Sequence, residues 1–134
     1  MIVGIGTDLC DIGRIERSLE RFGERFARKV LVDAELDRLR QQRKPAAYLA
    51  KRFAAKEAFS KALGTGIHFP VNWHNVWVEN ASSGRPSLSF SESLSTFLRQ
   101  RGVESVFVSI TDEEGMACAF VVVEGRKRQS RRRK

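Results

Sequence analysis

A carboxylate and an amine lie four residues apart in the middle of the chain, at Glu57 and Lys61. Side chains four apart on a helix leave it in nearly the same direction, so both would face one target. This spacing alone favours a solvated ion pair on the helix surface, which contributes about 0.3–0.5 kcal/mol. The alternative is a site for phosphate, in which the ammonium offsets charge that develops on the phosphate oxygens.

Asp8 is the second candidate carboxylate. It follows the glycine-rich segment GIGT, just past the end of a strand predicted over residues 2–7 and before a helix. It could cap that helix, although Asp11 is as well placed to do so. Two carboxylates from separate elements, with a lysine beside one, suit Mg²⁺ and a polyphosphate, because this hard cation prefers oxygen ligands. The spacing leaves open whether Asp8 and Glu57 meet.

Five arginines lie on one stripe of a helix predicted over residues 12–30. They step along the chain by 3, 4, 4 and 3 residues, within about an 80° arc, and they are Arg14, Arg17, Arg21, Arg25 and Arg28. The apolar face of this helix is expected to consist of Ile15, Leu19, Phe22 and Phe26. The stripe is either ordinary solvated surface or a docking face for an acidic partner. A helix break at Gly23 would divide it into two clusters.

Three more helices are predicted from apolar periodicity and from residues that start and stop helices. They cover residues 34–42, capped by Asp33, residues 46–63, ended by Gly64, and residues 91–101. The second of them carries a stripe about 100° wide that would let another element approach closely, formed by Ala54, Ala55, Ala58 and Ala62. The loop Gly64–Thr65–Gly66 fits a helix stop better than a phosphate loop, because the dipole at this helix end repels phosphate.

The strands complete the set of elements that must position these residues. They are predicted over residues 2–7, 75–80, 86–90, 105–111 and 116–124, and the last two form a hairpin. The order of strands and helices implies an α+β fold, in which the helices pack on a largely antiparallel sheet.

The composition indicates one domain over residues 1–125 and a basic tail over residues 126–134, which is expected to be disordered. The net charge is +8, but the last nine residues hold seven basic side chains and no acid. Without them 17 basic and 16 acidic residues remain, so a specific nucleic-acid binder is not favoured. The longest apolar run, residues 116–123, is too short to span a membrane, and we expect a soluble, cytoplasmic protein.

Four segments carry a resemblance to a known family: GIGTDLCDIGRIE, FARKVL, YLAKRFAAKEAFSKALGTGI and GRPSL. Together they resemble the small, homotrimeric holo-(acyl-carrier-protein) synthases, which are 4′-phosphopantetheinyl transferases. The resemblance covers roughly residues 1–124. It implies the phosphopantetheinyl transferase fold and the transfer of 4′-phosphopantetheine from coenzyme A to a serine of apo acyl carrier protein, in fatty acid biosynthesis.

The resemblance also implies roles for single residues. Asp8 and Glu57 would ligate Mg²⁺, Glu57 would be a candidate base, directly or through water, and Lys61 would contact the phosphates and assist the leaving group. The arginine stripe would dock the carrier protein, and each site would lie between two subunits of a homotrimer. The further coenzyme A contacts would be Arg52, Gly64, Thr65, Gly66, Gly84, Arg85 and Pro86.

One position departs from the common family pattern. Many members carry Ser-His after the VSI strand, with the histidine near the nucleotide, whereas this chain has Thr111 and Asp112, a pair that other members share. Two other classes of function stay open: a module that binds acidic surfaces or polyanions, and a family relic that only scaffolds carrier proteins. The intact Asp8, Glu57 and Lys61 argue against the relic.

If the arginine stripe docks the carrier protein, Arg14→Glu combined with Arg21→Glu raises the apparent KM for carrier protein by at least about tenfold and reverses its salt dependence, because two attractive charges become repulsive. The KM for coenzyme A changes little. Steady-state kinetics at several salt concentrations measures both constants. Equal losses for the two substrates would count against docking.

Overall fold

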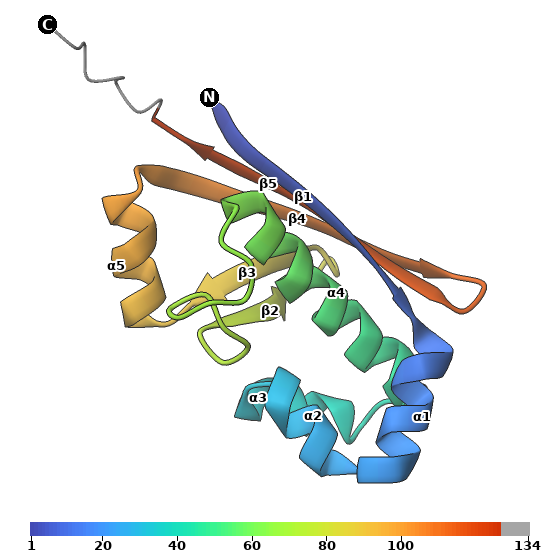
Figure 1. Cartoon of the computed structure of the whole chain (residues 1–134). Coiled ribbons are helices and arrows are strands. Elements are labelled where there is room, and N and C mark those ends of the chain that lie inside the picture. The colour runs from blue at the N-terminus through green and yellow to red at the C-terminus, as the bar shows by residue number, and fades with distance from the viewer. Residues whose placement is uncertain (127–134) are drawn as a thin grey trace, which may run out of the picture.

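The computed structural model describes residues 1–126 (Figure 1). In chain order the elements are β1 (Ile2–Asp11), α1 (Ile12–Phe22), α2 (Glu24–Val30), α3 (Asp33–Leu39), α4 (Pro45–Leu63), β2 (Val76–Asn80), β3 (Pro86–Phe90), α5 (Glu92–Gln100), β4 (Val103–Glu113) and β5 (Met116–Gly125). Of the predicted tail, Arg126 is described, with its guanidinium 3.1 Å from the Glu104 carboxylate. Residues 127–134 lie outside the described part of the chain.

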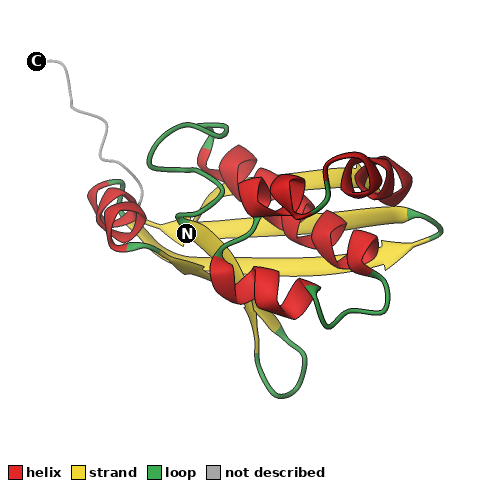
Figure 2. Cartoon of the chain, turned by 90° about the horizontal axis from the view of Figure 1, so that it is seen from below, coloured by secondary structure: helices red, strands yellow, loops and turns green. Residues whose placement is uncertain are grey.

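The strands form two antiparallel sheets. Strand β5 lies between β1 and β4 in a three-stranded sheet, and β2 pairs with β3 in a separate two-stranded sheet. Helix α5 lies at one end of the larger sheet, and α1 lies at the other end with the β4–β5 turn (Figures 1 and 2). The predicted α+β fold with helices on an antiparallel sheet is confirmed.

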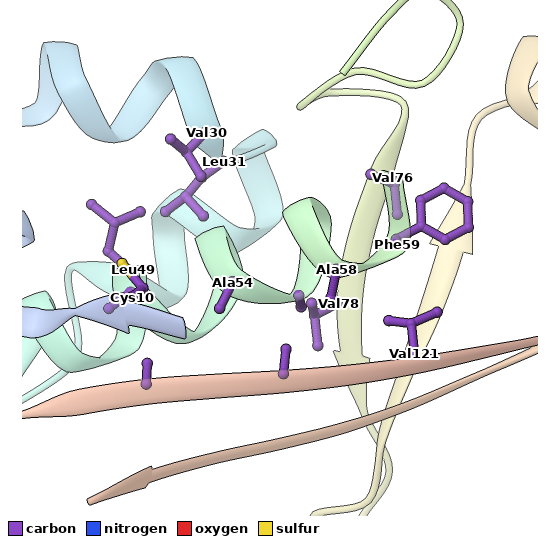
Figure 3. Close-up of a cluster of buried hydrophobic side chains, with 14 of the residues drawn as sticks. Cys10, Val30, Leu31, Leu49, Ala54, Ala58, Phe59, Val76, Val78 and Val121 are labelled. Atoms are coloured by element: carbon purple, nitrogen blue, oxygen red, sulfur yellow. The ribbon is translucent and has the colours of Figure 1, made fainter. Parts of the chain in front are cut away.

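Helix α4 lies against the larger sheet through very small residues. Its alanine stripe is buried, and so are Ala117 and Ala119 on the facing side of β5. A Cβ at Gly4 would collide with the Ala62 carbonyl oxygen, and a Cβ at Gly6 would collide with the Ala58 carbonyl oxygen. In Figure 3, Ala54 and Ala58 lie between α4 and the sheet. The glycines of the first strand therefore let the helix backbone touch the strand backbone.

The rest of the core lies on the other side of α4. Phe59 reaches the smaller sheet, where its ring lies 5.2 Å from that of Phe90 on β3, and Val76 and Val78 of β2 are buried close by (Figure 3). Helix α4 is thus covered on two sides, which explains why its apolar residues do not follow a single stripe.

Three sequence predictions need correction. The first strand continues beyond residue 7 to Asp11, because β1 stays paired with β5 as far as the Asp11–Met116 pair. Asp33 does not cap the following helix, because the helix begins at Asp33 and its cap position is Val32. Phe22 is not on the core face but is 49% exposed, since α1 ends there at the break that Gly23 makes with φ 62°.

None of the helices in residues 1–126 is both long and apolar enough to cross a membrane.

The backbone contact between α4 and β1 predicts a large cost for a methyl group at Gly6. Gly6→Ala lowers the free energy of unfolding by about 3 kcal/mol, because the new Cβ meets backbone atoms that cannot move independently. Gly13→Ala is the matched control, since its Cβ meets only the side chains of Asp11 and Arg17 at 3.2 and 3.4 Å. Urea denaturation of both variants measures the difference, and equal stability would contradict the close contact.

Candidate active site

Asp8 faces α4 because of the two-residue alternation of β1. It lies on the same side of the strand as Gly6 and Cys10, which are buried, whereas Thr7 and Leu9 are exposed on the other side. The Lys61 ammonium, which projects from α4, donates to Asp8 Oδ1 at 2.8 Å and to the Thr7 carbonyl oxygen at 3.2 Å. The Asp8 side chain is only 13% exposed and that of Lys61 is 52% exposed.

Asp8 is free of any capping role. The cap of α1 is Asp11, whose Oδ1 accepts a hydrogen bond from the Gly13 N–H at 2.8 Å. Of the two possibilities that the sequence left open, the structure assigns the cap to Asp11.

Glu57 is the third member of a carboxylate cluster that consists of Asp8, Glu57 and Lys61. Burial raises the pKa of Glu57, the Asp8 carboxylate raises it further, and the Lys61 ammonium opposes both effects. The hydrogen bond that Lys61 donates to Asp8 is the main cause of a raised pKa for Lys61. Asp8 thus adds to the effect of burial on the pKa of Glu57, and the single ammonium of Lys61 faces two carboxylates.

The carboxylate cluster fits a hard divalent cation. Mg²⁺ commonly takes one or two protein carboxylates and completes its octahedron with water and substrate phosphates. Residues 1–126 contain no group of three His, Cys, Asp or Glu side chains placed to hold a metal, so a zinc-type site with three or four protein ligands does not fit. The Lys61 ammonium on Asp8 already marks the place as favourable for positive charge.

Arg52 lies apart from the carboxylate cluster. It is buried, with its guanidinium 4.2 Å from the centre of the Tyr48 ring, and it donates to Asn80 Oδ1 at 2.8 Å. The Asn80 side-chain amide in turn donates to the Gly84 carbonyl oxygen at 3.1 Å. Arg52 is thus linked through Asn80 to the turn that contains Gly84, Arg85 and Pro86.

The loop Gly64–Thr65–Gly66 uses its backbone N–H groups to end α4. Gly64 adopts φ 75° and its N–H donates to the Lys61 carbonyl oxygen at 3.0 Å. The N–H groups of Thr65 and Gly66 both donate to the Ser60 carbonyl oxygen at 3.3 Å. These bonds agree with a helix stop, and the loop begins three residues after Lys61.

The five arginines of the predicted stripe are all exposed. The break at Gly23 divides them, with Arg14, Arg17 and Arg21 on α1 and Arg25 and Arg28 on α2. Arg28 lies 3.6 Å from Glu24, whose carboxylate also accepts two hydrogen bonds from Arg40, at 2.7 and 2.9 Å. The stripe therefore exists as two exposed basic clusters.

Asp112, at the position where many family members carry histidine, lies 3.4 Å from the Lys51 ammonium on α4. It also lines a cleft of about 680 Å³ between α1, the start of α4 and the β4–β5 turn. Arg43 and Lys44 line the same cleft, but no member of the carboxylate cluster does.

Sequence reasoning missed one functional candidate, the buried pair of Lys56 and Glu35. Lys56 is fully buried, and its ammonium lies 2.7 Å from the Glu35 carboxylate. Burial lowers the pKa of Lys56, although Glu35 opposes the change. The signal in the sequence is that Arg52 and Lys56, four residues apart, lie among many apolar residues of the predicted helix.

The comparisons with known proteins identify the family. A model of the 4′-phosphopantetheinyl transferase superfamily matches residues 4–121. The chain belongs to this superfamily. This phosphopantetheinyl transferase is 53% identical over 124 residues to a holo-[acyl-carrier-protein] synthase of Nitrosomonas eutropha, a match that covers 92% of this chain and 99% of the relative.

Solved structures agree with the family assignment. The holo-[acyl-carrier-protein] synthase of Neisseria meningitidis matches with a TM-score of 0.89 and 45% identity, over 92% of this chain and 99% of that chain. A holo-(acyl-carrier-protein) synthase from Bacillus anthracis in complex with CoA (3′,5′-ADP) matches with a TM-score of 0.79 and 34% identity, over 94% and 99%. The resemblance seen in the sequence motifs is therefore confirmed across the phosphopantetheinyl transferase domain.

The raised pKa of Glu57 predicts that this residue costs stability when it is ionised. Because its pKa is higher in the folded chain than in the unfolded chain, the cost is present at pH 7 and disappears as the pH falls through the folded-state pKa. Glu57→Gln therefore raises Tm by about 2 °C at pH 7 and changes it little below about pH 4. Calorimetry across this pH range measures the effect.

The control for this prediction is the same substitution made together with Asp8→Asn, where the gain at pH 7 shrinks because the repelling carboxylate is gone. A loss of stability at pH 7, or a gain independent of pH, would contradict the repulsion between Asp8 and Glu57.

Proposed function

We propose that this chain transfers the 4′-phosphopantetheine group of coenzyme A to a serine of apo acyl carrier protein in a Mg²⁺-dependent reaction at the carboxylate cluster. The products are holo carrier protein and adenosine 3′,5′-bisphosphate, and the reaction serves fatty acid biosynthesis. The observation that carries the proposal is the hydrogen bond between Lys61 on α4 and Asp8 on β1, with Glu57 one helical turn before Lys61 on the same helix. The names of the relatives and the coenzyme A complex of the Bacillus anthracis protein support the choice of substrates.

Asp8 and Glu57 would hold the Mg²⁺ ion. When bound, the ion supplies charge neutralisation and polarisation of the coenzyme A pyrophosphate oxygens. The two carboxylates lie on separate elements and are neither fully exposed nor fully buried, so they combine a fixed position with access to a large anionic substrate.

Glu57 is the candidate base for the attacking serine. In the reaction the serine oxygen forms a bond to the β-phosphorus, the bond from that phosphorus to the bridging oxygen breaks, and the serine proton passes to Glu57 directly or through one water. A carboxylate with a raised pKa holds that proton better at neutral pH than an ordinary one.

Lys61 is assigned to the phosphates. Its side chain is half exposed, so the ammonium can leave Asp8 for a phosphate oxygen. A charge-assisted hydrogen bond there offsets the negative charge that grows on the departing bisphosphate.

The remaining coenzyme A contacts are assigned to two loops and one arginine. Gly64, Thr65 and Gly66 begin three residues after Lys61, and the turn of Gly84, Arg85 and Pro86 offers the exposed Arg85 guanidinium to a phosphate. Because Arg52 is buried and bonds to Asn80, it would support this turn from beneath.

The carrier protein would dock on the exposed arginines of α1 and α2, from Arg14 to Arg28. Guanidinium groups suit this task because they bind carboxylates in bidentate geometry and stay charged. The nearly neutral charge of residues 1–125 makes these two clusters a distinct local feature.

We propose a homotrimer with active sites at the subunit interfaces. The face of the larger sheet that points away from α4 carries an apolar patch that a second copy of the chain would cover, formed by Ile5, Leu9, Phe107, Met116 and Phe120. The open position of the carboxylate cluster leaves room for a neighbouring subunit to complete the nucleotide pocket.

A cytoplasmic location is supported by the free thiols of Cys10 and Cys118, which suit a reducing compartment.

The proposal predicts that Asp8→Ala and Glu57→Ala each reduce transfer by at least about 1,000-fold, because each removes one of two carboxylate ligands. The fold remains intact, since neither side chain belongs to the buried core. Intact mass of the carrier protein measures transfer, and thermal melts of the same samples measure folding. Wild-type turnover in either variant would remove that residue from the site.

Mixed trimers test the shared site. Co-expression of Glu57→Ala subunits with Arg85→Ala subunits restores part of the activity, because some interfaces then combine two intact halves. Co-expression is required because subunit exchange between folded trimers can be slow. A fully active monomer by light scattering would contradict the shared site while leaving the transferase assignment standing.

A further inference from the structure

Lys56 is a fully buried lysine that the proposed chemistry does not use. Its ammonium donates to the Val30 carbonyl oxygen at 2.6 Å, to Glu35 Oε1 at 2.7 Å and to the Trp73 carbonyl oxygen at 2.8 Å. An ammonium has three donors, so every one of them is used. The three acceptors belong to the end of α2, to α3 and to the loop that leads into β2, which are three different neighbours of α4.

Glu35, the partner of Lys56, is held by further hydrogen bonds from the backbone. It is 2% exposed, and its carboxylate also accepts from the Val32 N–H and from the Val78 N–H, both at 3.1 Å. Val78 belongs to β2, so one buried ion pair joins α2, α3, β2 and α4. Hydrogen bonds to ionised groups are shorter and stronger than neutral ones, and they fix direction as well as distance.

The other side of α4 has few directional contacts. Toward the larger sheet most of its contacts are made by alanines and glycines, which are close but have little direction, and the hydrogen bonds there come from Lys61, whose side chain is half exposed. On the helix, Arg52 and Lys56 point toward α3 and β2, whereas Glu57 and Lys61 point toward β1. Within residues 1–126 no hydrogen bond holds the Glu57 carboxylate, so its direction depends on how α4 is rotated about its axis.

We propose that Lys56 and Glu35 are positioning residues for the transfer reaction: their buried bonds set the rotation of α4 and thereby direct the neighbouring Glu57 toward Asp8. The same bonds fix the position of α2, which carries Arg25 and Arg28, relative to α4. This inference rests on the proposed function, because it assigns Glu57 to the reaction.

A purely structural role for the Lys56–Glu35 pair predicts a different result, and a matched control distinguishes it from the positioning role. Lys56→Met keeps an unbranched side chain only one atom shorter but removes the three donors and leaves Glu35 buried without its partner, which destabilises the fold. Leu94→Ala is the control, because Leu94 is fully buried in α5, outside the proposed site, and its truncation destabilises a core to a comparable extent. Both variants are assayed at a temperature where circular dichroism shows them to be fully folded.

The positioning role predicts that Lys56→Met lowers kcat by about 100-fold, as expected for a misplaced catalytic group, and changes the KM for coenzyme A by less than about threefold. Leu94→Ala, with a similar loss of Tm, retains kcat within about twofold. Equal kcat values for the two folded variants would overturn the proposal.

Two further variants cover the case in which Lys56→Met does not fold. Lys56→Arg keeps the charge next to Glu35 but changes its reach, and it predicts a folded protein with a partial loss of kcat. Glu35→Gln combined with Lys56→Met removes both buried charges, so Tm recovers in part while kcat stays low. Recovery of kcat together with Tm would assign the pair to stability alone.

A crystal structure of Lys56→Arg, or of the double variant, separates this inference from the proposed function. The inference predicts that α4 rotates relative to β1 and that the Glu57 carboxylate moves away from Asp8. If the wild-type chain does not transfer phosphopantetheine, the proposed function fails, and this structural comparison still decides whether the pair sets the rotation. An unchanged Glu57 position would contradict it.

Discussion

The direct backbone contact between α4 and β1 is the constraint on which the rest of the structure depends. A Cβ at Gly4 or Gly6 would collide with carbonyl oxygens of the helix, and Ala117 and Ala119 lie buried beneath it on β5. Because only small side chains separate the helix from the sheet, Lys61 can reach both the carboxylate of Asp8 and the backbone of β1. The carboxylate cluster follows from this closeness.

Helix α4 has two polar sides with different tasks. One side is buried and uses its charges to bind neighbouring elements, through Lys56 and Glu35 and through Arg52 and Asn80. The other side reaches the surface at Glu57, whose pKa is raised by burial and by Asp8 and lowered by Lys61, and there we propose the cation site. Placing both sides on one helix connects the proposed catalytic carboxylate to the helices that would receive the carrier protein.

The sequence predicted those parts of the fold and site that depend on local spacing. The four-residue spacing predicts that Glu57 and Lys61 lie on one side of a helix. The sequence also offers Asp11 as a cap for α1, and because Asp11 takes that role, Asp8 stays available. The pairing of β1 with the distant β5 was not predictable from the sequence, so the first strand was predicted to end too early. The bonds of Lys56 were also missed, because two of its three acceptors are backbone carbonyls from distant segments, which no side-chain pattern reveals.

Anomalous diffraction from crystals grown with Mn²⁺ and coenzyme A tests the central claim, that β1 and α4 together build a cation and pyrophosphate site. Manganese is a suitable probe because it shares the preference of magnesium for oxygen ligands. The structure predicts a single strong anomalous peak within coordination distance of the Asp8 and Glu57 carboxylates and of the coenzyme A pyrophosphate. Fully occupied coenzyme A with the peak elsewhere, or with its pyrophosphate away from Lys61, would contradict the account.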